Sequence, residues 1–373
     1  MSAEDKAAVA AISEWVRVES PTSDAAGVDR MMALVAAEAE AAGIAVERVP
    51  GRDGMGGNLV LRAGPRRDDG GVLVLSHLDT VHPVGTLASD LPIRVEGDRL
   101  YGPGVFDMKG GAWLAFQAFK DVAASGEARL PLTFLFTPDE EIGSPTSRDL
   151  IEDLARRSAY ALVTEPARDH GGVVTARKGV GRFVVSVEGR PSHAGAKHEN
   201  GRSAIREAAL QIGAIEGLTD YERGITTNVG VVSGGTADNV VPQHCRFTVD
   251  LRVVTAEDGA EYAARLLALR PIGPDMRVAV EGGMNRPPYE RSPQSGALYE
   301  TARAVAEGLG FGLPEAARTG GGSDGNFTAA LGVPTLDGLG IAGDGAHTLT
   351  EHALISSIAP RRALMAGLLR ALG

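Results

Sequence analysis

A short apolar run that ends in a histidine and an aspartate constrains this chain more than any other feature. Residues 71–75 read Gly-Val-Leu-Val-Leu, which is typical of a strand buried on both faces. Residues two apart on a strand project to the same side, so His77 and Asp79 would emerge together at the strand's carboxyl end, where open α/β sheets bind ligands. A histidine beside a carboxylate suits a metal site, because one ring nitrogen ligates while the acid holds the other. A polar loop that merely contains both residues is the competing interpretation.

Length, charge and cysteine content narrow the class of protein. The chain has 373 residues, too many for one compact core, so two domains are expected. A net charge of -11 argues against nucleic acid and anionic membranes as partners. The single cysteine, Cys245, can form no intrachain disulfide and is expected in the core. The polar start of the chain has no apolar signal segment, and no run is long enough to span a membrane, so a cytoplasmic protein is expected.

Apolar periodicity predicts a larger unit interrupted by a smaller one. In the first half, strands and helices alternate, which predicts a mainly parallel sheet covered by helices. From Gly181 the order becomes strand, helix, two strands, helix and strand, which is the ferredoxin-like arrangement. The alternation of strand and helix then returns. We therefore expect an α/β domain formed by residues 1–178 and 287–373, with an inserted ferredoxin-like α+β domain at 179–286.

Four further stretches place acidic residues or a histidine at predicted strand ends or in loops. They are Tyr101–Gly111 with Asp107, Thr137–Gly143 with Asp139, Glu140 and Glu141, Thr164–Pro166 with Glu165, and Gly345–Thr348 with His347. Taken singly, a helix N-cap explains Asp107 and a solvated loop explains the acidic triplet. Together with His77 and Asp79, they gather two histidines and several carboxylates on one rim of one sheet, and a cation would offset the repulsion. That ligand set suits two zinc ions bridged by a carboxylate.

The motifs that carry these residues resemble those of one enzyme family. They are Ser-His-Leu-Asp-Thr at 76–80, Gly-Val-Phe-Asp-Met-Lys-Gly-Gly at 104–111, Asp-Glu-Glu-Ile-Gly at 139–143, Thr-Glu-Pro at 164–166, Pro-Ser-His-Ala-Gly at 191–195 and Gly-Gly-Gly-Ser-Asp at 320–324. In this order they resemble the M20 metallopeptidases, which include glutamate carboxypeptidases, acetylornithine deacetylases, succinyl-diaminopimelate desuccinylases and aminoacylases. The resemblance runs nearly end to end. It implies a zinc-binding catalytic α/β domain with an inserted lid through which the protein forms a homodimer.

The resemblance also implies a role for each residue of the rim. The implied ligands are His77 and Glu165 for one zinc ion, Glu141 and His347 for the other, and Asp107 as the bridge between them. Co²⁺ or Mn²⁺ would be substitutes for zinc. Asp79 would orient His77, and Glu140 would be the general base that takes a proton from the bridging water and gives it to the leaving amine. A cis peptide bond after Asp107 is implied as well.

In the inserted domain the resemblance points to four residues. His193 would reach the active site of a neighbouring subunit and stabilise the oxyanion. Asn239 and Arg252 would bind substrate, and Arg286 resembles the arginine that glutamate-releasing members use on a second carboxylate. A turn residue at His193 and a surface ion pair at Arg252 are the alternatives. The histidines expected to be structural or exposed are His82, His170, His198, His244 and His352, the last being a mild rival to His347.

These observations predict an enzyme. The first expectation is zinc-dependent hydrolysis of an amide bond that releases a C-terminal amino acid from a small peptide, as in glutamate carboxypeptidases. A deacylase of N-acyl amino acids is the alternative. A catalytically inactive dimeric binding protein is the second class considered. A two-metal phosphoesterase is a third class, which fits the ligand types but not the motifs of the inserted domain.

Overall fold

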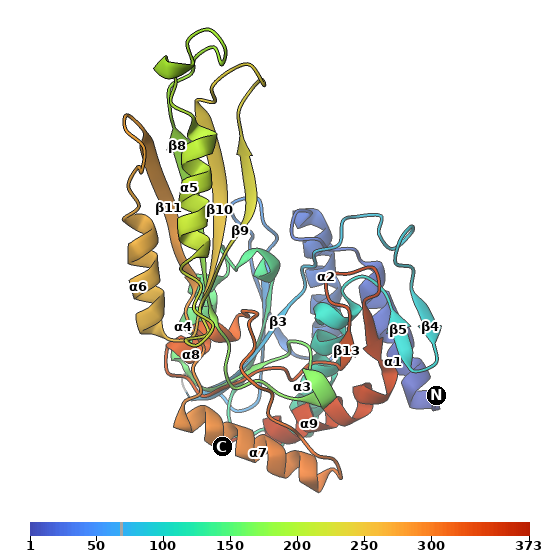
Figure 1. Cartoon of the computed structure of the whole chain (residues 1–373). Helices are drawn as coiled ribbons and strands as arrows, with labels where there is room; N and C mark the ends of the chain where they lie inside the picture. Colours follow the sequence, from blue (N-terminus) through green and yellow to red (C-terminus); the bar gives the residue numbers. More distant parts are fainter. Residues whose placement is uncertain (68–69) are drawn as a thin grey trace. The chain divides into compact units, whose positions relative to one another are not determined.

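The computed structural model describes residues 1–67 and 70–373, and they form two compact units (Figure 1). The first unit contains Met1–Ala176, Arg291–Thr319 and Ser323–Gly373, and the second contains Arg177–Glu290 and Gly320–Gly322. The chain divides near residues 176 and 290, and the sequence pattern places the expected boundaries at 178/179 and 286/287. The three glycines at 320–322, which the sequence pattern had assigned to the α/β domain, group with the second unit.

A six-stranded sheet forms the middle of the first unit, with the order β1-β2-β6-β3-β7-β12. The strands are β1 (Ala45–Val49), β2 (Asn58–Ala63), β3 (Gly71–His77), β6 (Leu132–Thr137), β7 (Ser158–Val163) and β12 (Thr335–Leu336). The last four strands of that order pair in parallel, whereas β1, β2 and β6 pair antiparallel. Every residue of β3 is buried, as its apolar run predicts.

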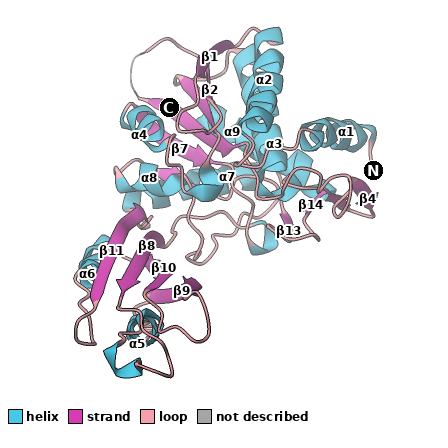
Figure 2. Cartoon of the chain, turned by 90° about the horizontal axis from the view of Figure 1, so that it is seen from above, coloured by secondary structure: helices cyan, strands magenta, loops and turns pink. Residues whose placement is uncertain are grey.

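Helices cover both faces of this sheet (Figure 2). One side holds α1 (Ala3–Arg17), α2 (Ala25–Ala41), α3 (Gly110–Ser125), α7 (Pro293–Gly308) and α9 (Ile358–Ala371), and the other holds α4 (Arg148–Arg156) and α8 (Gly325–Ala330). Because side chains alternate along a strand, Val72 and Val74 belong to the first core, and Leu73 and Leu75 to the second. Two buried cores therefore fix β3 and the residues that follow it.

Short elements complete the first unit, and the sequence pattern did not predict most of them. A second sheet has the order β13-β14-β5-β4, formed by β4 (Arg94–Glu96), β5 (Arg99–Tyr101), β13 (Gly343–Asp344) and β14 (His352–Leu354). Single helical turns occur at Glu140–Ile142 and Ile355–Ser357, and turns that include non-helical backbone angles occur at Val105–Lys109 and Asp169–Gly171. Strands this short show no periodicity to recognise. The small sheet matters because β14 pairs with β5 and brings distant segments together.

The second unit is an antiparallel sheet with the order β11-β8-β10-β9 and two helices. Its elements are β8 (Gly179–Glu188), a helical turn at His198–Asn200, α5 (Ala204–Glu216), β9 (Thr226–Gly234), β10 (His244–Val253), α6 (Ala256–Leu267) and β11 (Arg277–Arg286). This is the order of strands and helices that the sequence pattern predicts. Its own core includes Phe183, Phe247 and the buried Cys245. Within the described part of the chain, no helix combines the length and apolarity needed to cross a membrane.

Candidate metal centre

His77, the last residue of β3, lies at the centre of a cluster of carboxylates in the first unit. Its Nε2 atom is 3.2 Å from Asp107 Oδ1, 3.9 Å from Glu165 Oε1 and 4.0 Å from Glu140 Oε2. The acids come from the segments that follow β6 and β7, which flank β3, and from the turn before α3. Because parallel strands end at the same edge, residues far apart in sequence converge on one buried imidazole.

The second half of the cluster is built around His347. Its Nε2 atom is 3.2 Å from Glu141 Oε2 and 3.4 Å from Asp107 Oδ2. Asp107 therefore presents one oxygen to each of the two histidines, which is the arrangement expected of a carboxylate between two metal ions. The peptide bond that follows Asp107 is cis. His352, the rival, instead places its Nδ1 atom 2.9 Å from the carbonyl oxygen of Thr350.

Asp79 fixes both sides of this arrangement. Its backbone oxygen is 2.9 Å from His77 Nδ1, so that nitrogen donates its proton and Nε2 faces the carboxylates. The Asp79 carboxylate accepts the backbone N–H of Glu140 and of Glu141, both at 3.2 Å, and the Thr22 hydroxyl at 2.6 Å. Asp79 thus orients the imidazole through its backbone oxygen, and its fully buried carboxylate holds the turn that carries both glutamates.

The chemistry of the donor atoms fits divalent metal ions. Two groups, His77 with Glu140 and Glu165 and His77 with Asp107 and Glu141, each offer ligand atoms within 4.8 Å of one another. Glu141 Oε1 is buried and finds no hydrogen-bond partner among the described groups. A buried unpaired carboxylate oxygen is costly unless a cation or donor meets it. Imidazole nitrogens and carboxylate oxygens together suit zinc and the neighbouring transition metals.

The crowding of acids also controls protonation of the two imidazoles. Burial lowers the pKa of His77, but hydrogen bonds to Asp107 and Asp79 outweigh it and hold that pKa well above 6.5. Hydrogen bonds to Asp107 and Glu141 raise the pKa of His347 to about 10. Burial raises the pKa of Asp107, but its hydrogen bonds with His347 and His77 outweigh burial and lower that pKa. In the metal-free protein, both imidazoles are therefore protonated at neutral pH. A metal ion needs the lone pair of the nitrogen that carries this proton.

We expect metal affinity to rise with pH because of these protons. The raised pKa of His347, about 10, means that the ring stays protonated below that pH and must lose its proton when an ion binds. Zinc titration of metal-free protein between about pH 6 and pH 8 should show tighter binding at higher pH. Calorimetry in two buffers of different ionisation enthalpy should show proton release. An affinity independent of pH, with no proton released, would contradict this account.

A buried polar network behind the cluster was not assigned by the sequence pattern. Asp139 accepts the backbone N–H of Thr146 at 2.6 Å and its hydroxyl at 2.7 Å. Asp324, from the Gly-Gly-Gly-Ser-Asp motif, accepts the hydroxyl of Thr137 at 3.0 Å and also that of Ser144. The segment that carries Glu140 and Glu141 is therefore held from within the protein at both ends. The sequence showed these acids, but nothing local distinguished a buried scaffold from a ligand.

In the second unit, the exposed His193 forms part of a tight turn. Its Nδ1 atom accepts the backbone N–H groups of Gly195 and Ala196, both at 3.1 Å. Because Nδ1 accepts, the neutral ring carries its proton on Nε2. The N–H of Ala194 donates to the carbonyl oxygen of Asn239 at 2.9 Å, so the two segments lie side by side. His193 can therefore hold this turn through Nδ1 and still donate a hydrogen bond from Nε2.

Arg252 forms an ion pair with Asp250, which is the alternative interpretation of this arginine. Its Nε is 2.6 Å from Asp250 Oδ1 and its Nη2 is 2.8 Å from Asp250 Oδ2, while Nη1 donates to the carbonyl oxygen of Gly320 at 3.2 Å. Asp250 lies two residues before Arg252 in β10, so the two side chains project from the same face of the strand. This spacing is the sequence signal that could have indicated the ion pair. Arg286 is 3% exposed, and a Cβ at Gly322 would lie 2.6 Å from its Cδ. Both arginines therefore contact the glycine segment 320–322 within the second unit.

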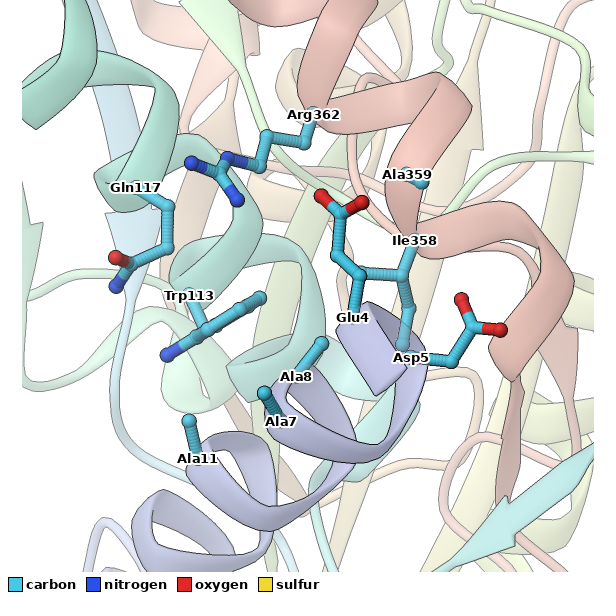
Figure 3. Close-up of a pocket in the computed structure, with 10 residues that line it drawn as sticks. All are labelled: Glu4, Asp5, Ala7, Ala8, Ala11, Trp113, Gln117, Ile358, Ala359 and Arg362. Carbon is cyan, nitrogen blue, oxygen red and sulfur yellow. The ribbon is translucent and has the colours of Figure 1, made fainter. Parts of the chain in front are cut away.

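A cavity elsewhere in the first unit does not contain this chemistry. It has a volume of about 280 Å³ and lies between α1, α3 and α9 (Figure 3). Its lining includes Ala8, Trp113, Ile358 and Arg362, and it includes no member of the carboxylate and histidine cluster. The candidate site is therefore the cluster at the strand ends, defined by its donor atoms.

Comparisons with known proteins identify the family of this chain. Residues 73–371 match the family described as Peptidase family M20/M25/M40. The chain is 31% identical to carboxypeptidase G2 of Pseudomonas sp. (strain RS-16), over 97% of this chain and 88% of that protein. This chain belongs to the M20 peptidase family. It is therefore a hydrolase of the peptidase and amidohydrolase type. It is also 30% identical to acetylornithine deacetylase of Myxococcus xanthus, over 74% of each chain.

Solved structures share the mixed α/β fold of this chain. Aminopeptidase PepT of Bacillus cereus matches with a TM-score of 0.77 at 22% identity, over 99% of this chain and 98% of that one. The YXEP protein of Bacillus subtilis, described as a dinuclear metal binding peptidase of the M20 family, matches with a TM-score of 0.67 at 15% identity, over 98% of each. At these identities the likeness concerns the fold alone.

Proposed function

We propose that this M20 enzyme uses two zinc ions to hydrolyse an amide bond and release a C-terminal amino acid, as a glutamate-carboxypeptidase-like exopeptidase. The observation that carries the proposal is Asp107, whose two oxygens face His77 and His347. The similarity to carboxypeptidase G2 over 97% of this chain supports the exopeptidase class. The similarity to an acetylornithine deacetylase keeps hydrolysis of N-acyl amino acids as the second candidate.

Each residue of the cluster then has a distinct task. The ions would be held by His77 with Glu165 and by Glu141 with His347, with Asp107 between them. When bound, they would polarise the scissile carbonyl and acidify a water molecule. Glu140 would accept the proton of that water and deliver it to the leaving amine nitrogen. Asp79 would keep His77 Nε2 directed at the metal and hold the turn that carries Glu140.

The second unit would bind and enclose the substrate. We propose that its β-α-β-β-α-β order and the spatial order β11-β8-β10-β9 make it a ferredoxin-like lid and dimerisation domain. The Nε2–H of His193 would donate to the oxyanion of the tetrahedral intermediate. Asn239 and Arg252 would bind the backbone end of the substrate, and Arg286 an acidic side chain.

A substrate screen with metal control tests the activity. We expect the zinc-loaded protein to release amino acids from dipeptides or N-acyl amino acids, because the cluster activates water beside a polarised carbonyl. Elemental analysis should find two metal ions per chain, chelation should abolish turnover, and added zinc should restore it, with Co²⁺ or Mn²⁺ as substitutes. Undiminished activity of fully metal-free protein would refute the metal mechanism. Cleavage of phosphate esters instead of amides would favour the phosphoesterase alternative.

A mixing experiment tests whether the lid acts across a dimer. Neither His193→Ala nor Glu140→Gln protein should be active alone, since each lacks one part of the site. If His193 serves the partner's site, a heterodimer of the two variants regains one intact site and recovers part of the wild-type activity. Subunit exchange is checked by differential tagging. The control is the His193→Ala protein alone, taken through the same mixing procedure. No recovery despite proven exchange, or an active monomer, would refute the arrangement.

A further inference from the structure

Glu351 is a buried carboxylate whose two oxygens are both occupied. Its Oε1 accepts the backbone N–H groups of Phe106 at 2.9 Å and Asp107 at 3.0 Å. Its Oε2 accepts the N–H of Gly104 at 3.0 Å and lies 2.7 Å from His82 Nε2. The residue is 1% exposed. Burying a carboxylate costs free energy unless donors replace its hydration, and here four donors converge on it.

Three of those four donors are backbone N–H groups of one loop, at Gly104, Phe106 and Asp107. One of the three therefore belongs to the proposed bridging residue Asp107 itself. The loop packs closely against Thr80 at Gly104, which has a φ of 70° and where an added Cβ would clash with Thr80 Cγ2. The bonds from Glu351 therefore fix the backbone from which the Asp107 side chain extends. That side chain must reach both His77 and His347, so its origin determines the geometry of both contacts.

The same glutamate is connected to the opposite side of the cluster through its own chain. Glu351 follows His347 by four residues, and a turn links them, with Thr348 N donating to Gly345 O at 3.0 Å and Glu351 N to Thr348 O at 3.3 Å. Residues 107 and 351 are 244 positions apart, yet this carboxylate joins their loops directly. His82, which the sequence pattern left as structural or exposed, is buried and completes the contact.

We propose that Glu351 is a positioning residue that sets the placement of Asp107 relative to His347, with His82 as its partner. This inference rests on the metal ligands of the proposed function. The hydrogen bonds of Glu351 go to His82 and to backbone N–H groups, and not to the imidazoles of His77 or His347. It would therefore act through the backbone of Asp107. Partners of this kind behind metal ligands typically change affinity or activity by about 10- to 100-fold when they are altered.

The chain offers a matched control for the loss of a buried carboxylate. Glu207, in the second unit, is 3% exposed and accepts the backbone N–H groups of Ile272 at 2.7 Å and Gly273 at 2.8 Å, and Gln211 Nε2 at 2.9 Å. It holds a loop in the same manner but contacts no residue of the metal cluster. Glu207→Gln therefore reports what a merely structural loss does.

The test compares Glu351→Gln with Glu207→Gln in the full-length protein. Glutamine keeps the size of the side chain, but its NH₂ group cannot accept the N–H of Gly104. Zinc affinity is measured by competition with a chromophoric chelator, and ligand geometry by the visible absorption of the cobalt-substituted protein. For Glu351→Gln we expect at least one ion to bind about 10- to 100-fold more weakly and the cobalt spectrum to change. Glu207→Gln should match wild type in both.

Two outcomes would overturn the inference. The first is wild-type affinity and an unchanged spectrum in Glu351→Gln, and the second is an equal loss in Glu207→Gln. If Glu351→Gln does not fold, Glu351→Asp, which withdraws the carboxylate by one methylene, and His82→Gln receive the same measurements. An unchanged spectrum and affinity in both would again overturn it. A wild-type protein that binds no metal would instead refute the proposed ligands, so the two failures are distinguishable.

Discussion

Replacing Glu140 with glutamine is expected to lower kcat by about 10²- to 10⁴-fold while both metal ions remain bound. Glutamine keeps the shape of the side chain but cannot accept a proton from water. The Glu140 carboxylate lies 4.0 Å from His77 Nε2, farther than that of Asp107. Its backbone N–H to Asp79 does not depend on the side chain, so the turn should persist.

The neighbouring Glu141 should behave differently. Its Oε2 is 3.2 Å from His347 Nε2. Its Oε1 is buried without a hydrogen-bond partner among the described groups, so a lone pair of that oxygen remains available for a metal ion. Glu141→Ala should therefore lose or weaken one metal ion. Metal content by elemental analysis, measured beside kcat and KM for both variants, separates the two roles. Because Glu140 also falls within reach of His77 and Glu165, equal metal loss in the two variants would make Glu140 a ligand and refute its role as base.

The second large effect is expected at Arg252. Arg252→Ala should lower kcat/KM for every substrate by roughly tenfold to several hundredfold, because a planar guanidinium can hold a carboxylate through two hydrogen bonds. The ion pair with Asp250 aligns the guanidinium, and the bond to Gly320 O anchors it. A substrate carboxylate has to share that guanidinium with Asp250. Arg252→Lys, which keeps the charge but not the planar fork, should give an intermediate loss.

Arg286 should affect only substrates with an acidic C-terminal residue. The measurement is the ratio of kcat/KM for N-acyl-glutamate to that for N-acyl-alanine within each variant. A ratio cancels any loss of folded protein, which matters because Arg286 is 3% exposed. Arg286→Ala should lower the ratio and Arg252→Ala should leave it near wild type. An equal loss on both substrates, or a wild-type preference for alanine, would favour the general deacylase over the glutamate carboxypeptidase.

The sequence by itself predicted the longer helices and strands and singled out the candidate site residues, because those signals are local. The unbroken apolar run before His77 can be satisfied only by burial on both faces, and two residues on a strand share a side. The change from strand-helix alternation to β-α-β-β-α-β is also a matter of periodicity. His77, Glu141 and Glu165 follow predicted strands, so their side of the sheet followed from the strand direction, whereas Asp107 and His347 stand in glycine-containing segments outside those strands.

Only the tertiary structure decided which distant groups meet. Asp107 faces both histidines, and Glu351 reaches Gly104 and His82, because β14 pairs with β5 and the two loops meet across the small sheet. These strands have three residues each, too few to show a period, so no pattern announced the pairing. Long-range partners depend on strand register and on the path of the chain through space. A buried carboxylate that ligates and one that supports a loop look alike in sequence, and their neighbours alone distinguish them.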